Sequence, residues 1–301
     1  MSAADASGGG VSVADASGGG VSVADASDGV TDRILAGPHG PLPVRVYAPA
    51  GAAGPGIVWL HGGGFGHGDL DMPEADAVAH ALAAAGVTVV SVDYRLAPTP
   101  EPAQAPDRPR AVYPVASDEA AFAYRWASET GLASGPWALG GASAGGNLAA
   151  GAILRLIDPR GPVPALAVLA YPTLHAVQRP HEPALAALLD ARGEDAETTA
   201  AAILGMYENY VGAPAAGAEV YAVPGEASIA QLTAFPPTVV ITDELDALRT
   251  SAEAFVESLR TAGVAVELSL EPGVGHGHLN RPELPAFASS IDLIAERILA
   301  L

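Results

Sequence analysis

The chain of 301 residues is half hydrophobic with only 16% charged residues, so it is long and apolar enough to bury a sizeable core. Its formal net charge of −20, with no lysine, disfavours nucleic acids and acidic membrane surfaces as partners, and favours neutral over anionic substrates. The lack of cysteine excludes disulfides, thiolate metal sites and a cysteine nucleophile.

The chain begins with a repeat of ten residues. Residues 5–14 read DASGGGVSVA, residues 15–24 repeat them, and a third copy starts at Asp25 and diverges. Two and a half copies are too few to bury the core of a β-solenoid, so a flexible Gly/Ser-rich tail over residues 1–30 is the better interpretation. The first residues also lack the basic and apolar regions of a signal peptide, which predicts a cytoplasmic protein.

From Thr31 onward, short apolar runs alternate with Ala-rich stretches of helical character. The predicted strands are 44–47, 57–60, 87–92, 165–169, 238–241 and 264–270. The predicted helices are 74–85, 117–130, 144–157, 247–262 and 291–301. This alternation predicts an α/β fold over residues 31–301, with a mostly parallel central sheet and helices on both faces. The opening strands have no helix between them, which predicts an antiparallel edge.

Residues 173–232 interrupt this alternation. They are punctuated by proline, and their pattern predicts two helices, at 183–189 and 196–210. Ligands bind at the carboxyl ends of the strands in open α/β sheets. An insertion at that end therefore predicts a helical cap over the site.

The run HGGGF that begins at His61 directly follows the strand predicted at 57–60. Three successive glycines let backbone N–H groups approach one point, as an oxyanion hole requires, where each donor is worth about 3 kcal/mol. The alternative is a phosphate-binding loop, but that needs a Gly-x-Gly-x-x-Gly or Walker pattern, which is missing here. Gly63 and Gly64, together with the N–H of Ala144, are therefore the predicted oxyanion hole.

The run GASAG at residues 141–145 matches a Gly-x-Ser-x-Gly pattern, which a chain with 35 glycines can also produce by chance. The context makes the match more specific, because apolar residues 137–139 precede it and a predicted helix follows from Ala144. A strand, a tight turn and a helix form a nucleophile elbow, which exposes the serine hydroxyl above the sheet. Ser143 is therefore the candidate nucleophile.

A serine nucleophile needs a base, and the base needs an acid that orients it; in this fold the acid precedes the histidine. His276 and His278 follow the strand predicted at 264–270, where the base is expected. The candidate acids follow the strand predicted at 238–241 and are Asp243, Glu244 and Asp246. Asp246 also fits as the N-cap of the next helix. Two alternating histidines with no third ligand do not predict a metal site.

These motifs resemble those of the bacterial hormone-sensitive-lipase family of α/β-hydrolase serine esterases, over residues 31–301. The resemblance is carried by HGGGF at 61–65, DYRLAP at 93–98, GASAGGN at 141–147 and short patterns at Asp246 and His276. The family's acid opens an Asp-Pro-Leu-like pattern and its base a His-Gly-Phe-like pattern, which implies Asp246 and His276 rather than their neighbours. The resemblance also implies that Tyr94 and Arg95 hold a loop near the site.

Two positions near the candidate site depart from the family pattern. Ala142, directly before the nucleophile, stands where the family usually has Asp or Thr, which leaves the subfamily open. His278 stands where the family usually has an aromatic residue, so a second imidazole is expected near the base.

The residues and the resemblance together predict a serine carboxylesterase that needs no cofactor and no metal. Its expected partner is a small neutral ester, with a short to medium acyl chain, that forms an acyl-enzyme on Ser143. An amidase, peptidase or acyltransferase would use the same triad, and a binding protein that has lost catalysis would keep the pocket. A monomer and a homodimer are both consistent with the sequence.

Overall fold

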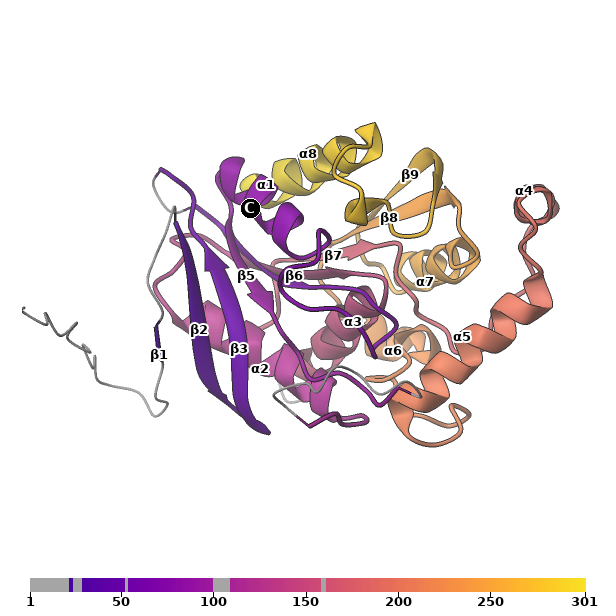
Figure 1. Cartoon of the computed structure of the whole chain (residues 1–301), viewed down its shortest axis with the longest axis horizontal. Coiled ribbons are helices and arrows are strands. Elements are labelled where there is room, and N and C mark those ends of the chain that lie inside the picture. The colour runs from indigo at the N-terminus through magenta and orange to yellow at the C-terminus, as the bar shows by residue number, and fades with distance from the viewer. Residues whose placement is uncertain (1–21, 24–28, 52–53, 100–108, 158–160) are drawn as a thin grey trace, which may run out of the picture.

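The computed structural model describes residues 22–23, 29–51, 54–99, 109–157 and 161–301. Within these residues, nine strands form a single sheet (Figure 1). The strands are β1 (Ser22–Val23), β2 (Val30–Gly37), β3 (Gly40–Tyr47), β4 (Gly56–Leu60), β5 (Thr88–Val92), β6 (Trp137–Ala142), β7 (Leu166–Ala170), β8 (Thr238–Leu245) and β9 (Val266–Gly275). Their order across the sheet is β1-β2-β3-β5-β4-β6-β7-β8-β9.

The sheet is antiparallel at one edge and parallel elsewhere, which confirms the predicted architecture. β1, β2, β3 and β5 pair in antiparallel fashion, whereas every pair from β5 through β4 to β9 is parallel. β2 is not among the strands that the sequence predicts. It lies near the edge, where most of its side chains stay partly exposed, so polar residues such as Thr31, Asp32 and Arg33 mask its pattern.

Helices cover both faces of the sheet. Along β4, successive side chains alternate between two hydrophobic clusters: Ile57 and Trp59 belong to one, and Val58 and Leu60 belong to the other. The first cluster is covered by α1 (Asp76–Ala84) and α8 (Pro285–Leu299). The second is covered by α2 (Val115–Glu129), α3 (Ala144–Ile157) and α7 (Arg249–Thr261). Figure 1 shows α1 and α8 on one side of the sheet and α2 and α3 on the other.

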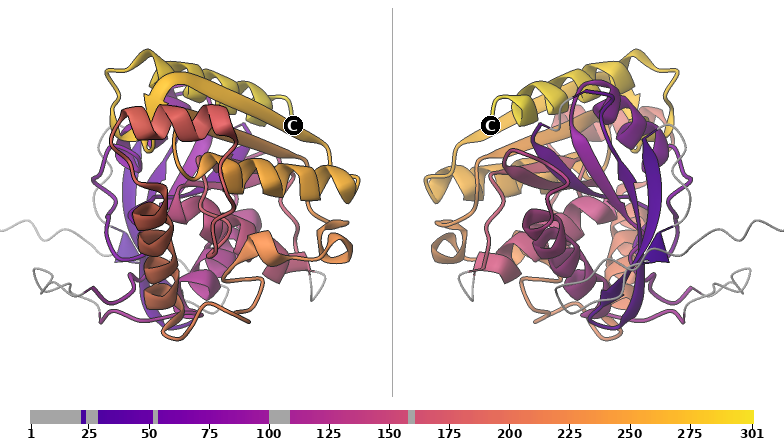
Figure 2. Two further views of the ribbon diagram at one scale, coloured as in Figure 1. Left: turned by 90° about the vertical axis from the view of Figure 1, so that its right-hand side faces the viewer. Right: turned by 90° about the vertical axis from the view of Figure 1, so that its left-hand side faces the viewer.

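The segment predicted as a cap is largely helical. It contains α4 (Pro183–Ala191), α5 (Ala196–Val211), the short 3-10 helix η1 (Pro224–Glu226) and α6 (Ile229–Leu232). α5 begins where the Asp195 side chain accepts a hydrogen bond from the N–H of Thr198 at 2.7 Å, and ends at Gly212 with a φ of 74°. Figure 1 shows α4 and α5 extending beyond the central sheet on one side, and the left view of Figure 2, taken from that side, shows them in front of it.

Most of the predicted N-terminal tail lies outside the described residues. The described part consists of residues 29–30, where β2 begins, and β1, in which Ser22 and Val23 pair with Ile34 and Arg33 of β2. The division of the chain at residue 30, the flexibility of the tail and the role of residues 173–232 as a cap stay predictions.

Among the helices of the described residues, none combines the length and hydrophobicity needed to span a bilayer.

Candidate active site

Ser143 lies in the tight turn between β6 and α3. Its φ of 53° is in the left-handed region, where residues other than glycine are strained. The flanking glycines are required by space: a Cβ atom at Gly145 would collide with the carbonyl oxygen of Leu60, and one at Gly141 would collide with the backbone of Gly145. These glycines therefore let α3 start directly against β4 and β6, with the serine at the tip of the turn.

A chain of hydrogen bonds connects Ser143 to a buried carboxylate. Ser143 Oγ lies 2.9 Å from Nε2 of His276, and Nδ1 of His276 lies 2.8 Å from Oδ2 of Asp246. The second oxygen of Asp246 accepts a hydrogen bond from the N–H of Leu248 at 2.8 Å. Asp246 therefore orients the imidazole and also binds the backbone that enters α7. It is not the N-cap that the sequence predicted, because α7 begins at Arg249 with Leu248 as its N-cap and has no capping hydrogen bond from a side chain. The structure brings together the serine, histidine and acid that the sequence selects.

The other two candidate acids have different partners. Asp243 Oδ1 lies 2.6 Å from Nδ1 of His278, and Glu244 accepts a hydrogen bond from the N–H of Gly273 at 2.7 Å. The second histidine is therefore paired with its own acid. Neither Asp243 nor Glu244 is the hydrogen-bond partner of His276.

The position of His276 changes its affinity for a proton. Desolvation lowers the pKa of His276, but the adjacent carboxylate of Asp246, and more weakly Glu74 and Asp243, raise it above the ordinary value of 6.5 to about 9. The ring acts as a base only when it is neutral. A raised pKa therefore moves the onset of activity to higher pH.

We expect kcat/KM for a neutral ester to increase with pH through an apparent pKa clearly above 6.5, because the fraction of neutral His276 increases over that range. The measurement is the initial rate at low substrate concentration across pH 5 to 10, corrected for spontaneous hydrolysis at each pH. An acidic limb with its midpoint below the ordinary histidine value would contradict this expectation.

The glycines after His61 differ in what their N–H groups bind. The N–H of Gly62 donates to Oε2 of Glu74 at 2.5 Å. Gly63 and Gly64 have φ angles of 104° and 58°, in the left-handed region that favours glycine. Within the part of the chain that the structure describes, the N–H groups of Gly63, Gly64 and Ala144 have no protein acceptor. Gly63 and Gly64 line the same cavity as Ser143, so these N–H groups are the available donors for a substrate oxygen.

Tyr94 holds the start of this glycine loop. Its hydroxyl donates to the carbonyl oxygens of His61 at 2.8 Å and Gly62 at 3.1 Å, and its ring stacks on the His61 imidazole with a centroid distance of 4.4 Å. Arg95 points elsewhere: its guanidinium donates to the carbonyl oxygen of His39 and lies 3.6 Å from a carboxylate oxygen of Glu119. Of the two residues that the resemblance places near the site, Tyr94 contacts the loop directly.

Two cavities meet at His276. One has a volume of about 450 Å³ and is lined by Gly63, Gly64, Met72, Glu74, Ser143, His276, Gly277, Asn280 and Arg281. The other has a volume of about 500 Å³ and is lined by Arg192, Glu194, Thr199, Ile203, Leu245, Asp246, Ala247, Leu248, Gly275, His276 and Arg281. The second cavity is lined in part by α5 and by the segment before it, so the inserted helices form one wall beside His276.

α5 also packs against the glycine loop. The ring of Phe65 stacks on Tyr210 at a centroid distance of 4.1 Å and contacts Tyr207 at 5.5 Å. A Cβ atom at Gly64 would lie within van der Waals distance of Met206. Movement of α5 would therefore displace the loop that offers the N–H donors.

Three residues at the site are missed by the sequence analysis: Glu74, Tyr171 and Asn280. Tyr171 directly follows β7, and its ring makes edge-to-face contacts with both His276 and His278 at centroid distances of 5.2 and 5.1 Å. Glu74 and Asn280 line the cavity of Ser143. The clearest sequence signal is for Asn280, which lies four residues after the base; the other two belong to no motif.

Among the described residues, no group of three or more His, Asp or Glu side chains converges to hold a metal ion.

Comparisons with known proteins agree with this geometry. A family model described as the alpha/beta hydrolase fold matches residues 57–280. Carboxylesterase NlhH of Mycobacterium tuberculosis is 37% identical over 268 residues, which cover 84% of this chain and 73% of that relative.

Solved structures are similar over almost the whole chain. An esterase of Pyrobaculum calidifontis has a TM-score of 0.76 at 31% identity, with 90% of this chain and 84% of that chain covered. Brefeldin A esterase, described as a bacterial homologue of human hormone-sensitive lipase, has a TM-score of 0.77 at 27% identity, with 91% and 78% covered.

Proposed function

Because this chain belongs to the α/β-hydrolase fold family, among the relatives of hormone-sensitive lipase, we propose that Ser143, His276 and Asp246 are its catalytic triad. The protein is a serine carboxylesterase. The observation that carries the proposal is the unbroken series of hydrogen bonds from Ser143 Oγ through both nitrogens of His276 to Asp246. N–H donors without a protein acceptor line the same cavity.

The proposed reaction begins when His276 takes the proton of Ser143 and Oγ attacks the ester carbonyl carbon. The carbonyl oxygen becomes an oxyanion that accepts hydrogen bonds from the N–H groups of Gly63, Gly64 and Ala144. The imidazolium of His276, stabilised by Asp246, then gives its proton to the departing alcohol. Water, deprotonated by His276, attacks the acyl-enzyme and releases the acid, and the proton returns to Ser143.

We propose neutral esters with short to medium acyl chains as substrates. The cavities of about 450 and 500 Å³ that flank His276 fit groups of this size, and both have apolar contributors such as Met72 and Ile203. The net charge of −20 supports a preference for neutral substrates and argues against nucleic acids or anionic membranes as partners. A cytoplasmic location and a monomeric or homodimeric state belong to the same proposal.

The test is hydrolysis of a chain-length series of p-nitrophenyl esters, beside a p-nitroanilide with the same acyl group. We expect turnover of the esters, a maximum at short or medium chains and a much lower rate for the anilide. A fluorophosphonate should add covalently to Ser143, as shown by peptide mass spectrometry. Faster anilide than ester hydrolysis would assign an amidase, and neither turnover nor labelling in a folded protein would leave only ligand binding.

A further inference from the structure

Glu74 is a buried carboxylate in the wall of the Ser143 cavity that the proposed reaction does not use. It lies in the segment between β4 and α1, and only 1% of its surface is exposed. Oε2 accepts the hydrogen bond from the N–H of Gly62 at 2.5 Å. Oε1 accepts hydrogen bonds from the Tyr171 hydroxyl at 2.6 Å and the Asn280 side-chain amide at 3.0 Å.

These three donors belong to three different loops of the site. Gly62 belongs to the glycine loop, Tyr171 follows β7 beside the nucleophile elbow, and Asn280 belongs to the loop of His276. One side chain therefore connects the donors of the predicted oxyanion hole with the neighbours of both the nucleophile and the base.

The backbone of Glu74 is fixed as well. Its carbonyl oxygen accepts a hydrogen bond from the indole of Trp59 at 2.8 Å, and its N–H donates to Asn280 Oδ1 at 3.3 Å. The carboxylate thus extends from a backbone position that two hydrogen bonds hold in place.

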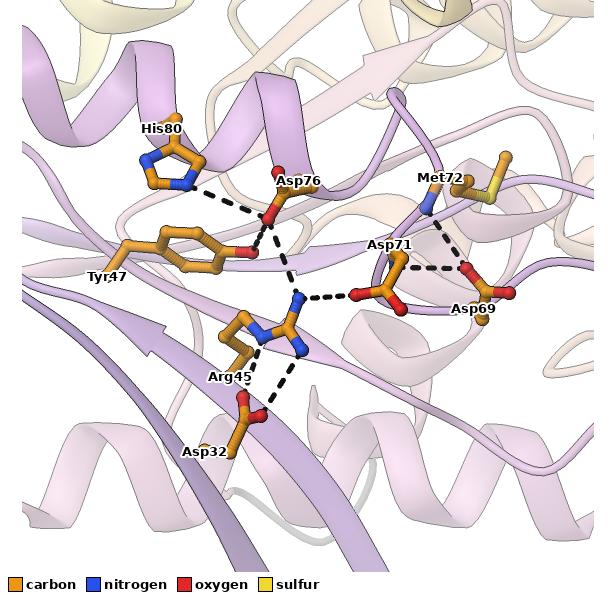
Figure 3. A network of polar contacts seen from close by, with 8 residues as sticks. All are labelled: Asp32, Arg45, Tyr47, Asp69, Asp71, Met72, Asp76 and His80. Carbon is orange, nitrogen blue, oxygen red and sulfur yellow. Dashed lines mark hydrogen bonds and ion pairs between the residues drawn. The ribbon is translucent and has the colours of Figure 1, made fainter. Parts of the chain in front are cut away.

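The outer side of the same segment is anchored separately. Figure 3 shows the guanidinium of Arg45 between the carboxylates of Asp32, Asp71 and Asp76, with the hydroxyl of Tyr47 on Asp76. The Arg45 nitrogens lie 2.6 Å from Asp32, 2.7 Å from Asp71 and 3.6 Å from Asp76. This outer cluster attaches the segment to β2 and β3 and makes none of the contacts of Glu74.

The hydrogen bonds that Glu74 makes favour its ionised form. A carboxylate only accepts hydrogen bonds, and all three partners donate. Burial raises the pKa of Glu74 above its usual value, and the hydrogen bonds from Tyr171 and Gly62 oppose that rise by favouring the charged form. An amide in its place would offer one oxygen and one NH₂ group to three donors, so at least one contact would be lost.

We propose that Glu74 is the positioning residue of the oxyanion hole. By binding the N–H of Gly62, it fixes the peptide units that follow, so that the N–H groups of Gly63 and Gly64 point at the substrate carbonyl. Through its hydrogen bonds to Tyr171 and Asn280, it also fixes the position of those N–H donors relative to His276. This inference rests on the proposed esterase function.

The test is Glu74→Gln, assayed with the best p-nitrophenyl ester. A complete loss of one oxyanion donor costs about 10²–10³ in kcat, and misplacement by about 1 Å costs up to 10². We therefore expect kcat to fall by about 10- to 100-fold while KM changes less than about threefold. Binding of an alkylboronic acid, whose tetrahedral adduct on Ser143 places an oxygen in the hole, should weaken by a factor similar to the loss in kcat.

Asp76→Asn is the matched control, because it changes an acid two residues away that belongs to the outer cluster. The side chain of Asp76 contacts Arg45, Tyr47 and His80 and none of the partners of Glu74. It should alter thermal stability but leave kcat within twofold of wild type. A folded Glu74→Gln variant with wild-type kcat and boronate affinity would overturn the proposal. So would a loss of kcat that is no larger than in Asp76→Asn at equal loss of stability.

If Glu74→Gln does not fold, Tyr171→Phe replaces it, since this variant loses one hydrogen bond to Glu74 and keeps the ring. A several-fold lower kcat with weaker boronate binding then supports the proposal, and wild-type values overturn it. A wild-type protein that hydrolyses no ester would refute the proposed function itself. Full activity of the variants beside an active wild type would refute only the role of Glu74.

Discussion

Ser143→Ala should fold like the wild type and lose about 10⁴–10⁶ in kcat, the range expected when a serine hydrolase loses its nucleophile. In the proposed reaction the Oγ atom forms the covalent bond to the acyl group, and no other described group occupies its place between His276 and the glycine loop. Removing one hydroxyl from the tip of the elbow leaves the packing of Gly141 and Gly145 intact. The measurement is kcat for a p-nitrophenyl ester, with circular dichroism as the check on folding.

A comparison of variants distinguishes the loss of the nucleophile from a general loss of folded structure. Ser143→Ala, His276→Ala and the double variant should have nearly equal residual rates, because the triad acts as a unit and losses within it are not additive. Ser128→Ala is a suitable control, since that serine bonds only a carbonyl of its own helix. A folded Ser143→Ala variant that keeps a tenth of the wild-type rate would remove Ser143 from the mechanism.

The proposed triad could be selected from the sequence because the nucleophile is marked locally and the fold fixes the chain order of the three residues. Ser143 is marked by its glycines, and the structure shows why: side chains at those positions would collide with β4. The choice of Asp246 over Asp243 and Glu244 needed the family pattern, because all three follow one strand. Only the structure shows that each acid has a different partner.

Glu74 could not be predicted for a physical reason. Its partners Tyr171 and Asn280 lie 97 and 206 residues away in the sequence, so no local spacing connects them. A single acid in a polar segment is normally exposed, and nothing in the composition distinguishes Glu74 from its exposed neighbour Asp71. Strand β2 was missed for a related reason: an edge strand with polar, half-exposed side chains lacks the apolar run that marked the central strands.

His278 shows how a departure from the family pattern is accommodated. The ring is fully buried and contacts Tyr171 edge-to-face, as an aromatic residue at this position would. Unlike a phenyl ring, it also binds Asp243 at 2.6 Å and Ser290 at 2.8 Å. Ser290 in turn donates to Glu271 at 3.0 Å. The histidine therefore supplies the polar contacts that allow these acids to be buried behind the base.

His278→Phe restores the aromatic character common in the family, yet we expect it to lower the free energy of unfolding by about 3–5 kcal/mol near neutral pH. The variant leaves the carboxylate of Asp243 buried without its partner, and the other oxygen of Asp243 already has no hydrogen-bond partner among the described residues. The measurement is urea unfolding followed by circular dichroism. The double variant His278→Phe, Asp243→Asn should recover part of the loss, because the buried group is then neutral.

The loss of stability in His278→Phe should depend on pH, and the direction of this dependence follows from the pKa of Asp243. Burial already raises the pKa of Asp243, opposed by the hydrogen bond from His278, so removing His278 raises that pKa further. A group whose pKa is higher in the folded state stabilises the fold when protonated, and this contribution is lost as pH rises through the folded-state pKa. The deficit of His278→Phe relative to wild type should therefore be largest at neutral to alkaline pH and shrink as pH falls. A deficit independent of pH, unchanged by Asp243→Asn, would mean that His278 contributes only through packing.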